Sequence, residues 1–322
     1  MAKHYSDDEL IADLGRVAKL IGRSPTRKEY KKAGRFSSCV IEERFGSWTK
    51  AKRSAGLVAY QSHVRLDLCP PPATSRYDKA PKITGDAMIL PDPHCPTHSV
   101  PLLEKYMAIA KRFKIRQQII PGDFLMADRF SQFPLKSKTT FEEEKEIAQA
   151  LFKWMFGFFD TTYWIMGNHD ARFLMKLDGE VKLSALGAII CEKIGTKKLI
   201  CSDYAYCILT SGGIEWRLNH PFNYSRIGGR NPCRLAEKYR QNVASGHNHL
   251  LGFSYDISGT NIGADLGTAC DPSRVHYQEL TEANNPQWIT AFAMIRNGAL
   301  YQFSLNPQQT DWSFWLPKGG AK

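Results

Sequence analysis

The sequence lacks any long apolar segment. No hydrophobic run approaches the roughly 18–20 residues that a membrane-spanning helix needs. Residues 1–8 also lack the apolar core of a secretory signal. C-x-x-C pairs are missing too, because none of the 8 cysteines is separated from another by two residues. No internal repeat is apparent. These absences predict a soluble, reduced protein in the cytoplasm, without a membrane anchor.

Composition indicates a folded globular chain with an uneven charge. Hydrophobic residues make up 43% and charged residues 23% of the 322 residues, a length that suffices for one large and one small domain. The formal net charge is +11, and residues 1–60 carry 13 Lys and Arg against 7 Asp and Glu, a net charge of +6. This basic region predicts a polyanionic partner. A basic surface that only keeps the protein soluble is the alternative.

Residues 1–60 have the pattern of a small helical unit. Ser6 and Glu9 are spaced as a capping box, and so are Thr26 and Glu29. Apolar residues follow the first box at helical spacing. We expect four short helices, the first ending at Gly22, the second at Gly34, the third covering about 38–45 and the fourth 49–55.

Short motifs in this unit carry a family resemblance. S-P-T at 24–26, R-F-G-S-W at 44–48 and A-G-L at 55–57 resemble the homing-endonuclease-associated repeat, over about residues 8–57. The resemblance implies a helical module that accompanies nucleases and binds DNA. Basic side chains would supply phosphate contacts, and the candidates are Arg27, Lys28, Lys31, Lys32 and Arg35. The alternative is an ordinary solvated helix face.

The composition changes after residue 60. Residues 61–84 include Pro70-Pro71-Pro72 and predict a stiff linker. From 85 to 322, strand and helix patterns alternate and later segments are mostly strand-like, which predicts an α/β domain. Expected strands lie at about 87–90, 118–120, 163–166, 204–210, 214–218, 242–244, 289–295 and 300–303. Expected helices lie at about 99–113, 140–159 and 181–194.

Five polar clusters, several of them directly after predicted strands, are candidates for one metal site. They are Asp92-Pro93-His94, Gly122-Asp123, Gly167-Asn168-His169-Asp170, His220, and Gly246-His247-Asn248-His249. Their oxygen and imidazole nitrogen donors suit Mn, Fe, Zn or Ni. One Asp can bridge two ions about 3.5–4 Å apart, the spacing used to hydrolyse phosphate esters. Taken singly, the aspartates could be turn or capping residues, and His220 a loop or core histidine.

In this order the clusters resemble the calcineurin-like metallophosphoesterase family, over about residues 85–305. The resemblance implies a four-layer α/β/β/α sandwich and two divalent metal ions. One ion would be held by Asp92, His94 and His249. The other would be held by Asn168, His220 and His247, with Asp123 bridging both. His169 would protonate the leaving oxygen, Asp170 would orient His169 by accepting its other ring proton, and Arg172 would clamp a substrate phosphate or be a surface helix residue.

The implied reaction is hydrolysis of a phosphate ester of nucleic acid or a nucleotide. A water between the two ions, with Mn as the first choice of metal, would attack phosphorus. A phosphodiesterase or nuclease is the main interpretation. A phosphomonoesterase acting on protein, nucleotide or nucleic-acid ends remains open, as does a non-catalytic DNA-binding protein with a structural metal site. Residues 263–272 and Arg172 are most similar to a phage-type subgroup, which implies a phage gene expressed in a bacterial host.

Overall fold

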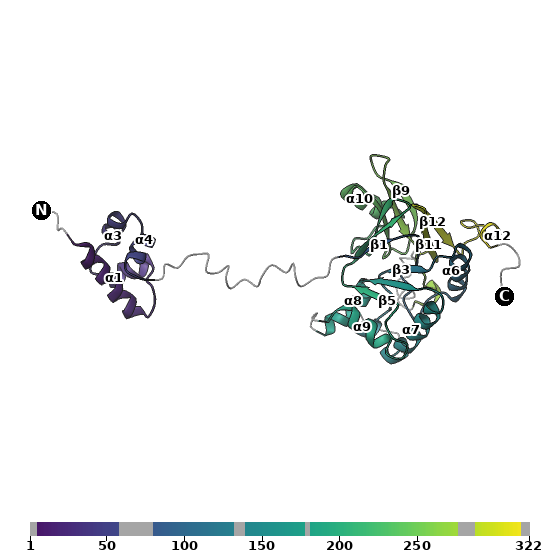
Figure 1. The fold of residues 1–322 in the computed structure, drawn as a ribbon, viewed down its shortest axis with the longest axis horizontal. Helices are drawn as coiled ribbons and strands as arrows, with labels where there is room; N and C mark the ends of the chain where they lie inside the picture. Colours follow the sequence, from purple (N-terminus) through teal and green to yellow (C-terminus); the bar gives the residue numbers. More distant parts are fainter. Residues whose placement is uncertain (1–4, 58–79, 132–138, 178–180, 276–286, 317–322) are drawn as a thin grey trace. The chain divides into compact units, whose positions relative to one another are not determined.

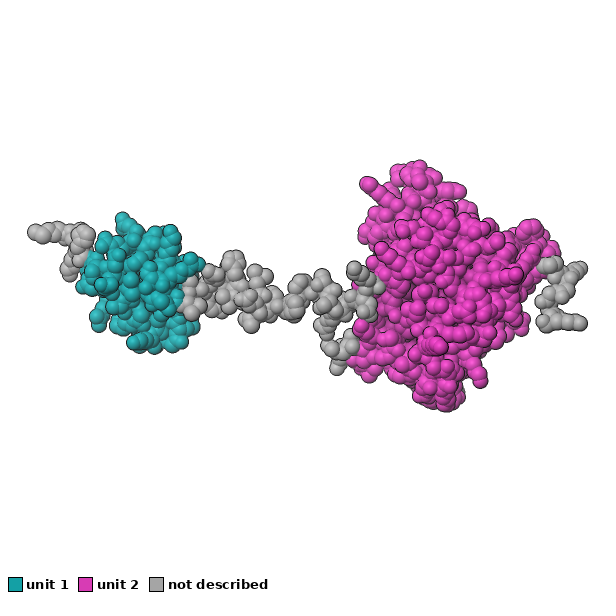
Figure 2. All heavy atoms as spheres, in the orientation of Figure 1, with its two compact units in different colours: residues 1–76 teal, residues 77–322 magenta. Residues whose placement is uncertain are grey.

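A computed structural model describes residues 5–57, 80–131, 139–177, 181–275 and 287–316 (Figure 1). The chain divides into two compact units, residues 1–76 and residues 77–322 (Figure 2). Each unit has a hydrophobic core of its own. Within the described residues, no helix combines the length and the apolar character needed to cross a membrane.

The first unit is a bundle of four short helices. They are α1 (Asp7–Ile21), α2 (Arg27–Ala33), α3 (Ser38–Phe45) and α4 (Trp48–Ser54). Both predicted capping boxes form, at the starts of α1 and α2. The apolar helix faces meet in a core that contains Leu10, Leu14, Val17, Tyr30, Ile41 and Ala51. The small helical fold expected for this part of the chain is confirmed.

The second unit is built on two six-stranded sheets. The strand order in the first sheet is β1 (Lys82–Thr84), β6 (Tyr206–Ser211), β7 (Ile214–Asn219), β8 (Asn242–Ser245), β10 (Ile262–Leu266), β9 (Leu251–Tyr255). In the second sheet it is β12 (Ala299–Ser304), β11 (Ala291–Arg296), β2 (Ala87–Ile89), β3 (Gln117–Pro121), β4 (Thr161–Ile165), β5 (Leu199–Ser202). Strands β2 to β5 run parallel to one another, and so do β7, β8 and β10.

Helices pack on the sheets. Those whose apolar side chains pack with the second sheet are α6 (Val100–Phe113), α7 (Phe141–Phe156), α8 (Asn168–Lys176), α9 (Leu183–Ile190) and the short α12 (Trp312–Trp315). Helix α10 (Arg230–Tyr239) packs on β8, β9 and β10 of the first sheet. Two single 3₁₀ turns, η2 (Asp128–Phe130) and η3 (Pro272–Arg274), lie in loops.

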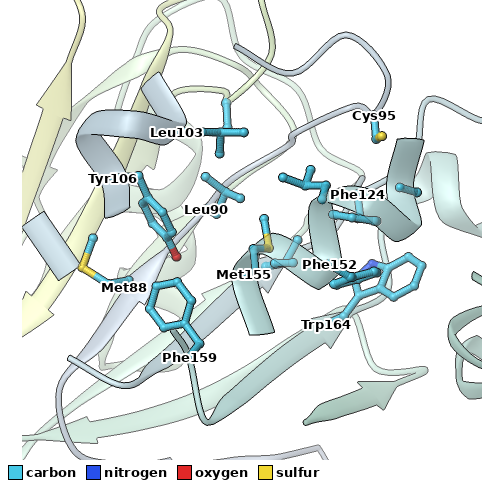
Figure 3. Packing of buried hydrophobic residues seen from close by; sticks show 14 of the residues in the cluster. Met88, Leu90, Cys95, Leu103, Tyr106, Phe124, Phe152, Met155, Phe159 and Trp164 are labelled. Atoms are coloured by element: carbon cyan, nitrogen blue, oxygen red, sulfur yellow. The ribbon is translucent and has the colours of Figure 1, made fainter. Parts of the chain in front are cut away.

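Alternation along the central strands produces two apolar layers. In β2, Met88 and the following Leu90 join the core beneath the helices, whereas Ile89 points between the two sheets, as the two-residue period of a strand requires. The layer beneath the helices includes Tyr106, Phe124, Phe152, Met155, Phe159 and Trp164 (Figure 3). The layer between the sheets includes Ile119, Trp216, Leu218, Leu266 and Ile295. The predicted α/β/β/α arrangement is therefore confirmed.

Some elements differ from the sequence-based expectation. Lys82–Thr84, which we placed in the linker, form strand β1 and pair with β6, because Ile83 is buried against the sheet. Residues 61–79 of the expected linker lie outside the described residues. Helix α10 was not expected, since its start, R-N-P-C-R, has the composition of a turn. Proline is nevertheless tolerated in the first turn of a helix, where its missing N–H is not needed.

Candidate metal centre

The five polar clusters follow strands that belong to both sheets. Asp92 and His94 come after β2, Asp123 after β3, and Asn168 opens α8 after β4; these strands are parallel neighbours. His220 follows β7, and His247 and His249 follow the neighbouring parallel strand β8. Because parallel neighbours end on the same side of a sheet, each sheet presents its polar loops at one edge.

The backbone of this region is unusual. Five of the seven predicted ligands adopt a left-handed conformation that non-glycine residues seldom occupy. Their φ angles are 44° for Asp92, 45° for His94, 48° for Asp123, 77° for His247 and 58° for His249. Such backbone costs on the order of 1 kcal/mol or more at each position and collects at functional sites. The surrounding fold therefore maintains tight turns at the strand ends that carry the ligands.

Two glycines let these turns approach one another. Gly122, at a φ of 91°, lies against His220, and a Cβ at this position would collide with the imidazole ring. Gly167 lies against Asp123, and a Cβ there would collide with the backbone of that residue. The glycines that precede Asp123 and Asn168 therefore permit a close approach that a side chain would prevent.

One group of converging side chains consists of Asp92, His94 and His249, whose potential ligand atoms all lie within 4.8 Å of one another. The Nε2 atoms of His94 and His249 are 3.0 Å apart, and both rings are buried. The Nδ1 atoms of both rings are also buried and make no hydrogen bond with described residues. Two buried Nε2 atoms that face each other beside the Asp92 carboxylate fit the shared coordination of a cation better than they fit a dry core.

A second group consists of Asp123, His220 and His247, again with ligand atoms within 4.8 Å of one another. The side-chain oxygen of Asn168 lies 2.8 Å from His220 Nε2 and 2.9 Å from His247 Nδ1. Asp123 Oδ2 lies 3.2 Å from His220 Nε2 and 3.9 Å from His94 Nε2. Asp123 therefore stands between the two groups, in the position that a bridging carboxylate needs.

Three imidazoles of the site, those of His94, His247 and His249, favour their neutral form. Burial lowers the pKa of His94 well below its ordinary value. Burial also lowers the pKa of His247 to about 4 and that of His249 to about 3. A neutral imidazole keeps a lone pair on one nitrogen, which is the form that coordinates a metal.

The carboxylates and His220 behave differently. Burial raises the pKa of Asp92 well above its ordinary value. Burial acts in the same direction on Asp123, but the charges of His220 and His169 outweigh it and hold the pKa of Asp123 well below its usual range. Burial alone would lower the pKa of His220, yet the Asp123 carboxylate raises that pKa to about 9. A divalent cation could replace the His220 proton beside the same carboxylate, so the donor set fits a pair of cations.

His169 lies beside these groups, but not in the way we predicted. Its Nε2 is 4.0 Å from Asp123 Oδ2, and its Nδ1 lies 2.8 Å from the backbone carbonyl of Met126. Asp170 does not accept a ring proton from His169. Its carboxylate instead accepts hydrogen bonds from the Trp164 indole (3.0 Å) and from the backbone N–H groups of Leu125 (3.1 Å) and Gly167 (3.1 Å).

The predicted hydrogen bond from the His169 ring to Asp170 is therefore wrong. The backbone carbonyl of Met126 accepts that ring proton instead. Asp170 ties the loop after β3 to the start of α8, so it organises the backbone around His169 instead. A backbone carbonyl carries no side-chain signal, and residue types could not have revealed Met126 in this role. The sequence indicates only that Met126 lies three residues after Asp123 and therefore near the site.

Arg172 lies close to His169. Its Nη2 is 3.0 Å from His169 Nε2, and its Nη1 donates to the Met126 carbonyl at 3.2 Å. Nη1 also lies 3.5 Å from a carboxylate oxygen of Asp128. The guanidinium is thus held at the border of the site, where the predicted contact with a substrate phosphate remains a proposal.

Sequence reasoning did not single out a buried pair behind the histidines. Asn248 lies between His247 and His249, and its side-chain N–H donates to Asp265 Oδ1 at 3.2 Å. Asp265 also accepts a hydrogen bond from the backbone of Gly229 at 2.7 Å. The polar residue between two histidines after a strand was the available signal for Asn248. Nothing in the sequence connected it to Asp265.

The basic candidates of the first unit are all exposed. Arg27, Lys28, Lys31 and Lys32 lie on α2, and Arg35 follows that helix. Arg27 pairs with Glu42 at 2.7 Å, so part of its charge is already compensated. Their exposure is compatible with phosphate contacts, which remain a prediction.

Comparison with known proteins gives two sets of similarities. Residues 5–58 match the family described as the homing endonuclease associated repeat, which confirms the resemblance seen in the first unit. The search of curated proteins found no match. Among solved structures, Vps29 from Chaetomium thermophilum shares 11% identity with a TM-score of 0.38, covering 69% of this chain and 86% of that one.

Two further solved structures are similar to the chain. Yfce, a phosphoesterase from E. coli, shares 13% identity with a TM-score of 0.40, covering 70% of this chain and 95% of that one. Vps29 from Entamoeba histolytica, complexed with Zn²⁺, shares 13% identity with a TM-score of 0.36, covering 69% and 93%.

Proposed function

We propose that the chain is a two-metal phosphoesterase that hydrolyses a phosphodiester of nucleic acid or a nucleotide. The observation that carries this proposal is the convergence of two ligand groups on Asp123. Asp92, His94 and His249 would hold one ion, and Asn168, His220 and His247 would hold the other, with Asp123 shared. When bound, divalent cations would neutralise phosphate charge and make a nearby water more acidic.

His169 is the proposed proton donor to the leaving oxygen. Since a carbonyl can only accept, the Met126 carbonyl keeps the proton of the neutral ring on Nδ1, which leaves the Nε2 lone pair facing Arg172. Burial lowers the pKa of His169, so the ring is neutral before substrate arrives. A phosphate anion beside Nε2 favours the protonated imidazolium, which can then release that proton to the departing alkoxide.

Arg172 is proposed to exchange partners during binding. Its fork of N–H groups can leave His169 Nε2 and bind two phosphate oxygens. That exchange would free Nε2 to take up a proton at the moment when the phosphate anion stabilises it. Arg172 and His169 would thus act on the same substrate group from neighbouring positions on α8.

The test starts from protein stripped of metal by a chelator and then given Mn, Ni or Zn. We expect Mn-supported hydrolysis of an aryl phosphodiester, with slower hydrolysis of the matching monoester. Asp123→Asn should reduce the activity to that of the metal-free protein. The matched control Asp160→Asn, an exposed aspartate that pairs with Arg116, should leave it unchanged. Protein that stays inert with all three metals would count against the proposal, and faster monoester turnover would favour a phosphomonoesterase.

The first unit is proposed to deliver this activity to DNA. Replacing Lys28, Lys31 and Lys32 by alanine should weaken DNA binding and reduce its dependence on salt, by about one unit of log–log slope for each lost phosphate contact. Lys111→Ala, an exposed lysine on α6, is the control and should not change the slope. Unchanged affinity and slope in the triple variant would remove the DNA-delivery role.

A further inference from the structure

The loop that follows His220 exposes several large apolar side chains. Phe222 is 77% exposed, Tyr224 67% and Ile227 56%. Together they form a short apolar segment, because all three lie within six residues of one another. Clustered exposed apolar side chains mark surfaces that contact a partner. Phe222 lies two residues after the proposed metal ligand His220, so a partner that covers the loop lies beside the candidate metal centre.

This loop is anchored to the site. The backbone N–H of Ser225 donates to the Asn248 side chain at 3.4 Å, which places the loop against the residue between His247 and His249. The Asn231 side chain donates to the carbonyl of Asn223 at 2.8 Å. Because these contacts set the backbone before any partner arrives, binding at the exposed rings requires little ordering of the loop.

A second set of contacts holds the end of the loop. Gly229 donates to the buried carboxylate of Asp265 at 2.7 Å, and Asp265 also accepts from Asn248. Gly228 packs on strand β9 so closely that a Cβ would come within 2.9 Å of the Leu251 carbonyl. The loop is therefore built into the same hydrogen-bonded unit as the histidine-bearing turn.

Charge indicates which kind of partner fits. Residues 221–236 contain Arg226, Arg230 and Arg234 and no Asp or Glu, so this stretch has a net charge of +3. All three arginines are exposed. Asp256, which directly follows the neighbouring strand β9, is buried. Its carboxylate accepts hydrogen bonds from Ser258 and Asn261 within the same turn. A surface that combines arginines with exposed rings suits a polyanion that also presents flat apolar groups.

Single-stranded nucleic acid has this chemistry. Its bases are unstacked and can lie on aromatic side chains, and its phosphates pair with arginine. Bases inside a duplex are already stacked and cannot reach such rings without being extruded. A second copy of this chain would bring three further arginines against the same three, which disfavours a symmetric contact between copies.

We propose that residues 221–230 form a stacking platform for the unpaired bases of a nucleic-acid strand, with Phe222 and Tyr224 as the stacking rings and Arg226 as a phosphate contact. The proposal rests on the proposed phosphoesterase function and specifies its substrate class. The strand to be cut would be single-stranded where it enters the site, and a fully paired duplex would be a poor substrate.

The test uses the full chain and the double variant Phe222→Ala, Tyr224→Ala. A phosphorothioate oligothymidylate of about eight nucleotides competes with hydrolysis of the small aryl phosphodiester, which reports binding at the catalytic unit and not at the first unit. We expect the inhibition constant to rise at least about tenfold in the double variant. Turnover of the aryl substrate alone, measured with each variant, is the reference against which the inhibition constant of that variant is determined.

The matched control is Phe314→Ala. Phe314 is 70% exposed on α12, which packs with the second sheet and is well separated from α10 in Figure 1. The inhibition constant of the oligothymidylate for Phe314→Ala should equal that for the unmodified protein. An equal rise in both variants, or no rise in the double variant, would overturn the platform. A change of oligomeric state on size exclusion that occurs only in the double variant would assign the loop to a contact between copies, which also overturns it.

A second readout does not depend on catalysis. A strand containing 5-bromodeoxyuridine is irradiated with the metal-loaded protein, and the cross-linked peptide is identified by mass spectrometry. Cross-links within residues 221–226 support the platform even if no substrate is hydrolysed, in which case the phosphoesterase proposal alone has failed. If the aryl phosphodiester is hydrolysed but cross-links form only elsewhere, the platform is wrong and the proposed activity stands.

Discussion

Asp13 in the first unit and Asp92 in the second are both buried, but their surroundings differ. Asp13 accepts hydrogen bonds from the Tyr30 hydroxyl (2.5 Å), the Arg16 side chain (2.7 Å) and the backbone of Arg35 (2.8 Å). Although burial opposes its charge, these donors hold the pKa of Asp13 below its ordinary value. Its charge is compensated locally, so the residue stabilises the fold of the helical unit.

Asp92 has fewer hydrogen-bond donors and more titratable neighbours than Asp13. Its Oδ2 accepts from the backbone of His247 at 2.9 Å. Its Oδ1 makes no hydrogen bond with a described residue, although His220 Nδ1 lies 3.3 Å away. Burial raises its pKa, and the nearby Asp123 carboxylate adds to that rise. The comparison suggests a working rule: a buried carboxylate with a full set of donors is structural, whereas one crowded by other titratable groups is a candidate ligand.

We expect the largest effect from His169, which lies beside the crowded carboxylates of the second unit and has no counterpart in the first. Replacing it by alanine should lower the turnover of the aryl phosphodiester roughly 10²–10⁴-fold, the usual contribution of a proton donor. Bound metal, measured by elemental analysis, should stay the same, because His169 is not among the proposed ligands. His98→Ala, which removes a histidine outside the clusters, is the control. Loss of metal in His169→Ala would place His169 among the ligands instead.

Glu144 on α7 tests the rule with a third buried carboxylate. It accepts a hydrogen bond from the backbone of Ala127 at 2.7 Å, and burial raises its pKa from 4.5 to about 7. The folded state therefore binds the proton more tightly than the unfolded state does. Its contribution to stability is complete below about pH 4.5 and is lost as the pH rises through about 7.

The difference in pKa corresponds to about 3 kcal/mol. Glu144→Gln keeps the acceptor but cannot ionise, so we expect its free energy of unfolding to gain about that much relative to the unmodified protein between pH 4.5 and pH 8. Urea unfolding of both proteins across this range measures the difference. Parallel curves would show that Glu144 ionises normally and that burial alone does not mark an unusual carboxylate.

Metal binding should change the thermal stability of one unit and not of the other. A ligand at 100 times its Kd stabilises the state that binds it by about 2.7 kcal/mol. We expect Mn to raise the unfolding transition of residues 77–322 and to leave that of the helical unit unchanged, as followed by calorimetry against chelated protein. Asp92→Asn should lose most of the shift. Equal shifts of both transitions would mean that Mn acts on the whole chain non-specifically.

The two units also differ in how far sequence could predict them. In the helical unit, capping boxes and apolar spacing are local signals, and the helices they indicated form with ends displaced by one residue or less. In the larger unit, polar residues at strand ends correctly indicated which clusters meet. Their convergence follows from the parallel order of β2, β3 and β4 and of β7 and β8.

Contacts that depend on the backbone could not be predicted. The partner of His169 is a carbonyl, which any residue at position 126 would supply. Strand β1 has three residues and only one buried side chain, too short for its alternation to be recognised. The anchoring of Asn248 by Asp265 joins residues from a turn and a strand, and no periodic pattern links them. The types of residue in the site could therefore be predicted from the sequence, whereas the orientation of their side chains could be determined only from the folded structure.

The smallest effect concerns Asp13. Asp13→Ala leaves the buried Tyr30 hydroxyl and the Arg35 backbone without their acceptor, which should cost about 2 kcal/mol in the stability of the helical unit. Asp7→Ala, on the same helix, removes an exposed aspartate that pairs with Arg44 and should cost less than about 1 kcal/mol. Thermal unfolding followed by circular dichroism separates the two variants. Hydrolysis of the aryl phosphodiester should be unaffected in both, because a locally compensated carboxylate serves only the unit that contains it. Equal destabilisation by both variants would show that a full set of donors around Asp13 adds nothing beyond a surface ion pair.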